Sequence, residues 1–160
     1  MTNAAFKITA KYWNEWACQS IKLVRDCSKG EDEARLRSKY ILLSYALELI
    51  VKSRLVAVSN ITEANLIQDY KHNVPKILEE LKSLGELEKI GIKSLPKQVK
   101  KYIYSIETTD GKIFYFCDFT NIRYYPKPIK DFWDKEETVL FTGKIMLDIA
   151  DRVRNLWRQS

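Results

Sequence analysis

The sequence predicts an all-α fold, a four- to five-helix up-and-down antiparallel bundle forming one domain over residues 1–160. The run 40–52 is apolar around most of its circumference, so other helices or a second subunit have to enclose it. Large apolar residues recur at helical spacing in three further long segments. Short to medium connections between these segments favour antiparallel neighbours.

The first helix is predicted over residues 9–28, and Gly30 is a natural stop just beyond it. Trp13 and Trp16 recur on one side of this helix together with Leu23. A pair of tryptophans one turn apart can stack bases. We expect this pair instead to belong to a stripe that faces the core or a dimer partner.

The second helix begins after the acidic residues 31–33, which suit a helix N-terminus, and runs to about Ser59. Ser44, Glu48 and Lys52, each four residues apart, form the one polar stripe through it. Glu48 and Lys52 can be a plain structural ion pair. Because burying such a pair costs desolvation, the alternative is that it faces a groove or a dimer seam as part of a site.

The third helix begins sharply, with Asn73 as N-cap, Pro75 in the first turn and Gly85 as its stop. The last helix is predicted over 135–158. Arg154 lies near its C-terminus, where the helix dipole favours positive charge, and this alone can account for its position.

Between the third and last helices, two alternatives stay open. Apolar residues at helical spacing favour a helix over 95–106, whereas the tight turn Asp110-Gly111 favours a small β-hairpin insertion near 103–117. The following segment, 121–128, contains two prolines and is predicted to be an ordered turn or extended bend.

Composition narrows the function only slightly. The formal net charge of +6 favours anionic partners such as nucleic acid or nucleotides. No apolar run is long enough to cross a bilayer and no signal-peptide layout is present, so we expect a cytoplasmic protein without a membrane partner. The three cysteines lack metal-ligand spacing and the five glycines are scattered, so neither a metal site nor a cofactor is predicted.

Three stretches in order carry a family resemblance: Ser44-Tyr-Ala-Leu-Glu-Leu-Ile-Val-Lys52, Lys71-His-Asn-Val74 and Ile122-Arg-Tyr-Tyr-Pro126. Over about residues 36–158 they resemble HEPN domains, the "higher eukaryotes and prokaryotes nucleotide-binding" helical bundles. The resemblance implies a helical bundle, often a homodimer, in prokaryotic defence or toxin–antitoxin systems. It also implies partners such as a cognate nucleotidyltransferase or an antitoxin protein.

Many proteins of that family are metal-independent RNases with an arginine four to six spacers before a histidine. The single histidine here is His72, and the nearest preceding arginine, Arg54, lies eighteen positions upstream. An endoribonuclease would therefore need an atypical site built from Arg123, His72 and Arg154. Arg154 could stabilise a phosphorane, but no neighbour of it in the sequence titrates near neutrality to accept the proton.

A mixture of cationic and aromatic side chains makes the bend at 123–127 the main candidate for ligand contact. Guanidinium binds phosphate bidentately and tyrosine rings stack on bases, although the same side chains could instead pack internally. His72 can either contact ligand or fix the start of the third helix through a loop carbonyl. The predicted ligand-binding residues are Glu48, Lys52, His72, Arg123, Tyr124, Tyr125 and Lys127.

The sequence thus favours a non-catalytic HEPN-like helical protein. It would bind RNA, a nucleotide or a cognate protein partner in a prokaryotic defence or toxin–antitoxin module. One alternative is a metal-independent endoribonuclease toxin with an atypical active site. The other is a purely structural, dimerising interaction subunit.

Overall fold

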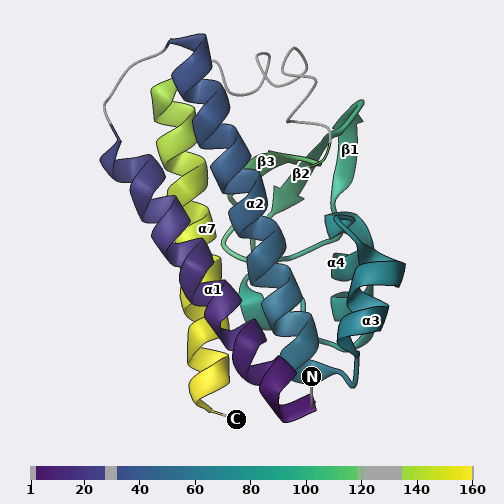
Figure 1. Ribbon diagram of the computed structural model, residues 1–160. Coiled ribbons are helices and arrows are strands. Elements are labelled where there is room, and N and C mark those ends of the chain that lie inside the picture. Colours follow the sequence, from purple (N-terminus) through teal and green to yellow (C-terminus); the bar gives the residue numbers. More distant parts are fainter. Residues whose placement is uncertain (1–2, 28–31, 119, 121–134, 160) are drawn as a thin grey trace.

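The computed structural model describes residues 3–27, 32–118, 120 and 135–159 (Figure 1). In chain order the described elements are α1 (Asn3–Asp26), α2 (Glu33–Val58), α3 (Glu63–Asn65), the π-helix η1 (Leu66–Tyr70), α4 (Val74–Ser83), the 3₁₀-helix η2 (Glu88–Ile90), β1 (Lys97–Lys100), β2 (Ile103–Glu107), β3 (Ile113–Cys117) and α7 (Glu136–Arg158). The described residues are 69% helical and include five α-helices and a three-stranded antiparallel sheet. The predicted all-α bundle is therefore wrong, and the fold is α+β.

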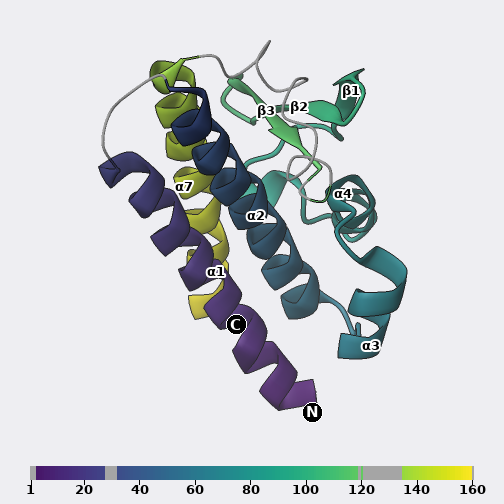
Figure 2. The same cartoon turned by 45° about the horizontal axis from the view of Figure 1, so that its top comes forward.

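The three long helices α1, α2 and α7 pack side by side, and α2 runs antiparallel to α1 and parallel to α7 (Figures 1 and 2). Helix α2 also contacts α4 and β3, so it is covered on several sides. Leu43, Leu47 and Ile50 on its predicted inner face are all 0% exposed. The prediction that this helix is enclosed by other elements is confirmed.

The sheet explains why the all-α prediction fails. β2 pairs with β3 in antiparallel register, with Ile106 opposite Phe114, and β1 pairs with the other edge of β2. Of the two alternatives for this segment, the hairpin is present and the helix over 95–106 is wrong. Aromatic and β-branched residues dominate β2 and β3, and Ile106 and Phe114 are both buried at 0% exposure, which favours strands that pack on a core.

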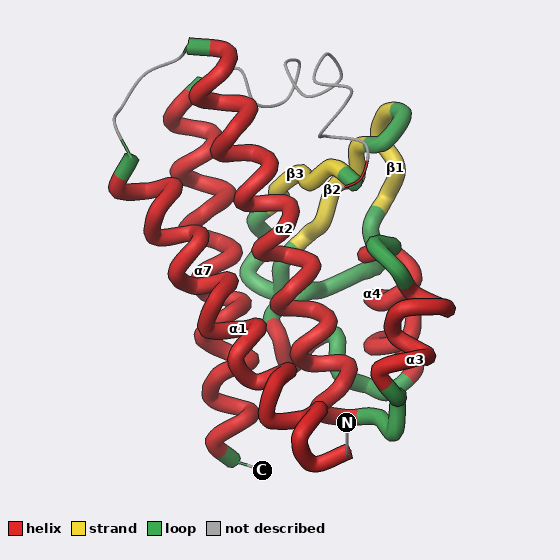
Figure 3. Tube along the Cα trace, viewed as in Figure 1, coloured by secondary structure: helices red, strands yellow, loops and turns green. Residues whose placement is uncertain are grey.

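The sheet and α4 lie on the side of α2 that faces away from α1 (Figures 1 to 3). β3 contacts both α2 and α7. The strands therefore add a second layer to the helical core, and their ends come close to the start of α4.

The connection from α2 to α4 is tightly built. Thr62 and Asn65 form a capping box at α3, which continues directly into η1. The backbone N–H of Lys71 donates to Leu66 O at 3.1 Å and closes the wide turn. Asn73 then caps α4 as predicted, accepting from the Lys76 N–H at 3.1 Å.

Candidate functional site

A buried carboxylate on α2 gathers two of the predicted site residues around it. The side chain of Glu48 is 3% exposed, and its Oε1 accepts a hydrogen bond from Lys52 Nζ at 2.5 Å. His72 Nδ1 lies 2.9 Å from the same oxygen. Because an ionised carboxylate can only accept, Nδ1 is the donor in this contact. The structure thus brings Glu48, Lys52 and His72 together, although they come from two separate segments.

The second oxygen of this carboxylate, Glu48 Oε2, is buried and has no hydrogen-bond partner among the described residues. A buried polar atom without a partner is costly, and such atoms concentrate at functional sites or where water and ligands bind. His72, by contrast, has a side chain that is 50% exposed. The buried Glu48 therefore holds in place a histidine ring that reaches the protein surface.

Unusual backbone geometry places His72 on Glu48. The π-helix η1 is followed by its C-cap residue Lys71, which has a φ of 47° although it is not a glycine. Single π-turns and left-handed non-glycine residues cost free energy and occur often at functional sites. Among the described residues, Tyr102 is the other non-glycine with positive φ, at 68°, and its carbonyl accepts from the Asp118 N–H at 3.2 Å.

Lys71 lines a cavity of about 400 Å³, which we call the His72 pocket, and Asp118, the hydrogen-bond partner of Tyr102, lines it as well. It lies between the start of α4 and the ends of β2 and β3. It is lined by Lys71, His72, Asn73, Val74, Pro75, Tyr104, Phe116, Asp118 and Thr120. Its volume falls in the usual range for small-molecule sites, about 300–1,000 Å³.

One wall of the His72 pocket is aromatic. Tyr104 and Phe116 face each other across β2 and β3, with ring centroids 5.3 Å apart and an interplanar angle of 18°. Phe116 is buried at 1% exposure, whereas Tyr104 is half-buried and has the more accessible ring. Burial, with Asp118 adding to it, raises the pKa of Tyr104, so its phenol stays a hydrogen-bond donor at neutral pH.

The opposite wall carries side-chain donors rather than backbone donors. The N–H groups of Val74 and Lys76 at the start of α4 already donate to His72 O and Asn73 Oδ1, at 3.1 Å each. The basic residues that line the pocket are Lys71 and His72, and Asp118 adds one carboxylate. An anionic ligand would therefore depend on the first two rather than on an uncapped helix N-terminus.

Arg154 is held elsewhere, at the contact between α1 and α7. Its guanidinium donates to both oxygens of Glu15, at 2.7 and 3.0 Å, and to Asp151 at 2.9 Å. The hydrogen bond from Arg154 lowers the pKa of Glu15 despite partial burial. None of the contacts given for Arg154 joins it to the His72 pocket, so the structure does not bring Arg154 and His72 together.

The remaining predicted residues, Arg123, Tyr124, Tyr125 and Lys127, lie outside the described residues. Sequence reasoning missed the aromatic pair of the His72 pocket and Lys71 beside it. The strand alternative near 103–117 carried part of the signal, because alternation along both strands of a hairpin places residues of matching parity on one face.

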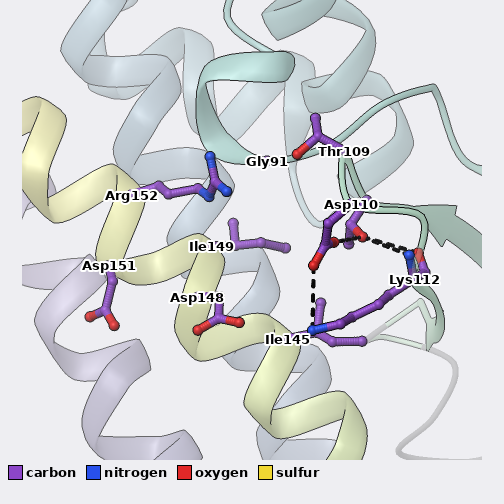
Figure 4. Close-up of a pocket in the computed structure, with 10 residues that line it drawn as sticks. Gly91, Thr109, Asp110, Lys112, Ile145, Asp148, Ile149, Asp151 and Arg152 are labelled. Carbon is purple, nitrogen blue, oxygen red and sulfur yellow. Dashed lines mark hydrogen bonds and ion pairs between the residues drawn. The ribbon is translucent and has the colours of Figure 1, made fainter.

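A second, smaller cavity of about 210 Å³ lies between α7 and the turn after β2 (Figure 4). Arg152 extends from α7 across Gly91, so closely that a Cβ at Gly91 would lie 3.0 Å from Arg152 Nε. On the other side, Asp110 accepts from Thr108 Oγ1 at 2.5 Å and pairs with Lys112 Nζ at 3.4 Å. Three carboxylates, those of Asp110, Asp148 and Asp151, line this cavity with two cations, whereas the His72 pocket has one carboxylate, Asp118. The smaller cavity is therefore less suited to an anionic ligand.

Comparisons with protein-family models, curated proteins and solved structures found no significant match to this chain. The resemblance to HEPN domains therefore stays a prediction. Within the described residues, no group of three or more His, Cys, Asp or Glu side chains could hold a metal ion. The described helices also include none with the length and apolar character needed to span a bilayer.

Proposed function

We propose that this protein binds RNA or a nucleotide in the His72 pocket, without cleaving it. The observation that carries the proposal is the buried Glu48 carboxylate, which fixes His72 at the rim of an aromatic cavity. A ring held in one orientation by a buried partner is preorganised for a ligand. The proposal concerns this site and leaves the base identity open.

The two walls of the pocket offer complementary chemistry for such a ligand. A base would stack on the exposed face of Tyr104, whose other neighbour is the buried ring of Phe116. The phosphate would meet Lys71 and His72, which line the opposite wall. The formal net charge of +6 would add a long-range attraction for polyanions.

Binding is favoured over cleavage because RNA cleavage needs two catalytic groups and the described residues around the pocket supply one of them. Cleavage of RNA needs a proton acceptor and a group that stabilises the phosphorane. His72 could accept a proton, but the guanidinium of Arg154 is engaged by Glu15 and Asp151. An endoribonuclease with an atypical site stays the alternative, with Arg123 as its remaining arginine.

We also propose a protein partner, either a second copy of the chain or a cognate nucleotidyltransferase or antitoxin. A row of exposed apolar side chains on α1 supports a partner of some kind. A cytoplasmic setting is supported by the three free cysteines, which fit a reducing compartment. Membership of the HEPN family and a role in defence or toxin–antitoxin modules remain part of the proposal on the resemblance alone.

Fluorescence anisotropy with a labelled single-stranded RNA decamer, and with labelled AMP, tests the binding proposal. We expect affinity that weakens with salt. Tyr104→Leu should weaken binding roughly 5- to 150-fold through the loss of one stacked base. Lys71→Ala should weaken it as well, whereas Lys144→Ala, an equal charge change on the exposed side of α7, should have no such effect. No binding of either probe at low salt would contradict the proposal, as would equal losses in the two lysine variants.

A further inference from the structure

Helix α1 exposes a row of large apolar side chains along its length, which we call the α1 stripe. Its members are Ile8 at 60%, Tyr12 at 55%, Trp16 at 52% and Leu23 at 59% exposure. At 3.6 residues per turn, they fall within an arc of about 80° on one side of the helix. The core-facing side of α1 is separate from this stripe and is formed by Phe6, Ala10, Ala17, Cys18, Ile21 and Val24.

The size of the stripe sets it apart from ordinary surface residues. Single exposed apolar side chains are common, whereas contiguous patches of several hundred Å² mark interaction sites. Four side chains of this size, each more than half exposed, present roughly 400 Å². A stable interface buries ~800 Å² per partner, so the α1 stripe is large enough to be the apolar centre of one. In both views α1 lies at the outer edge of the three-helix layer, where a partner can approach it (Figures 1 and 2).

The order of residues along the stripe points to its occupant. We infer that a second copy of this chain covers it, with the two α1 helices packed antiparallel about a two-fold axis level with Asn14. A two-fold interface has to be self-complementary, because each surface meets itself in reverse. Reversing α1 about this level places Tyr12 against Trp16 of the second copy, and Ala5 against its Leu23. The two-fold axis would therefore create two contacts between Tyr12 and Trp16, and two contacts in which the large Leu23 side chain packs on the small Ala5.

The flank of the stripe is also compatible with this arrangement. Lys11 and Glu15 lie along one side of it, and the same reversal brings Lys11 near Glu15 of the second copy. The side chain of Glu15 is 39% exposed and keeps acceptor capacity beyond its bonds to Arg154. A parallel arrangement would instead place like residues level with each other, including the two lysines and the two glutamates.

This inference gives the proposed homodimer a surface and does not depend on the nucleotide-binding half of the proposal. The test is sedimentation velocity on the full chain from about 1 to ~100 μM, concentrations at which a dimer with a micromolar dissociation constant forms. We expect the mass to rise from 18.8 kDa toward twice that value. Trp16→Glu should raise the dimer dissociation constant at least ~30-fold. Ile67→Glu is the matched control, because Ile67 is 62% exposed on η1 and lies outside the stripe, and this variant should dimerise as the wild type does.

Several results would overturn the inference. A wild-type chain that stays monomeric over the whole concentration range would do so, including one that instead binds anionic lipid vesicles through α1. Dimers that survive Trp16→Glu and Leu23→Glu would also contradict it, provided that circular dichroism shows both variants folded. In a Cys27→Ser background, efficient disulfide cross-linking of Gln19→Cys to itself would indicate parallel helices and refute the antiparallel arrangement. RNA affinity retained by monomeric Trp16→Glu would separate this outcome from the fate of the His72 pocket.

Discussion

Replacing Glu48 should reveal that the polar stripe of α2 holds the pocket together. Glu48→Leu removes the carboxylate that Lys52 and His72 share, at 2.5 and 2.9 Å. Breaking a fully buried ion pair costs about 3–5 kcal/mol, because one charge stays behind unpaired. The side chains of Lys52 and His72 are 14% and 50% exposed, so both can partly recover solvent. We therefore expect a smaller loss of about 2–3 kcal/mol in the free energy of unfolding.

Urea unfolding at pH 7, followed by circular dichroism, measures this loss, and a fall in Tm of ~4–12 °C should accompany it. The informative comparison is Glu48→Leu with Lys52→Met in one chain. Removing both charges leaves neither unpaired, so the double variant should be more stable than Glu48→Leu alone. The reasoning fails if Glu48→Leu is as stable as the wild type, or if the losses of the two single variants simply add.

Three further predictions concern other parts of the fold. Burial raises the pKa of Glu86, but hydrogen bonds from two basic side chains outweigh this effect and hold the pKa below 4.5. The stability that the Glu86 carboxylate contributes is therefore full above pH 4.5 and is lost on further acidification. Denaturant titrations between pH 7 and 3 should show this loss of stability, and the loss should be smaller in Glu86→Gln. Cys27 is exposed, whereas burial raises the pKa of Cys117 to about 12. Mass spectrometry after brief iodoacetamide treatment should therefore find Cys27 modified and Cys117 protected until urea is added. Equal modification of the two cysteines would contradict the packing of β3. Gly91→Ala should destabilise the fold more than Gly85→Ala, because both have positive φ but only at Gly91 would the new Cβ meet Arg152; equal losses would show that Arg152 does not lie there.

The sequence predicted elements whose signal is continuous or local. Helix α2 carries large apolar residues around most of its surface, and α4 begins at an N-cap that reads directly from Asn73. The choice between a helix over 95–106 and a hairpin near 103–117 stayed open, because residues 95–106 are too few to separate a period of two from one of 3.6. β1 gave no periodic signal at all, since all four of its residues are exposed.

The core-facing side of α1 was not identified from the sequence. Trp13, Trp16 and Leu23 were expected on one stripe facing the core or a dimer partner; Trp16 and Leu23 are more than half exposed, so the core-facing alternative is wrong for them and the dimer-facing one stays a prediction. Small residues such as Ala10 and Ala17 occupy the core-facing side instead, each at 0% exposure. Alanines allow two helices to approach closely, so the side with the largest residues need not be the buried one.

For the candidate site, the sequence pointed to individual residues but did not predict which of them lie in contact. Glu48 and Lys52 were readable as an i,i+4 pair, and His72 stood out as the single histidine. That His72 reaches Glu48 depends on a π-turn and on the positive φ of Lys71, and no local pattern predicts either. The aromatic wall depends in turn on strand register, which is set by pairing between distant residues.

In our proposal, the pocket between His72 and Tyr104 receives a nucleotide. Titrating ¹⁵N-labelled protein with AMP, and then with a short single-stranded RNA, tests this most directly through NMR chemical-shift changes. We predict saturable changes that cluster at Lys71, His72, Tyr104 and Asp118 and that disappear in Tyr104→Leu. Changes confined to other surfaces, or none at millimolar nucleotide, would contradict the claim.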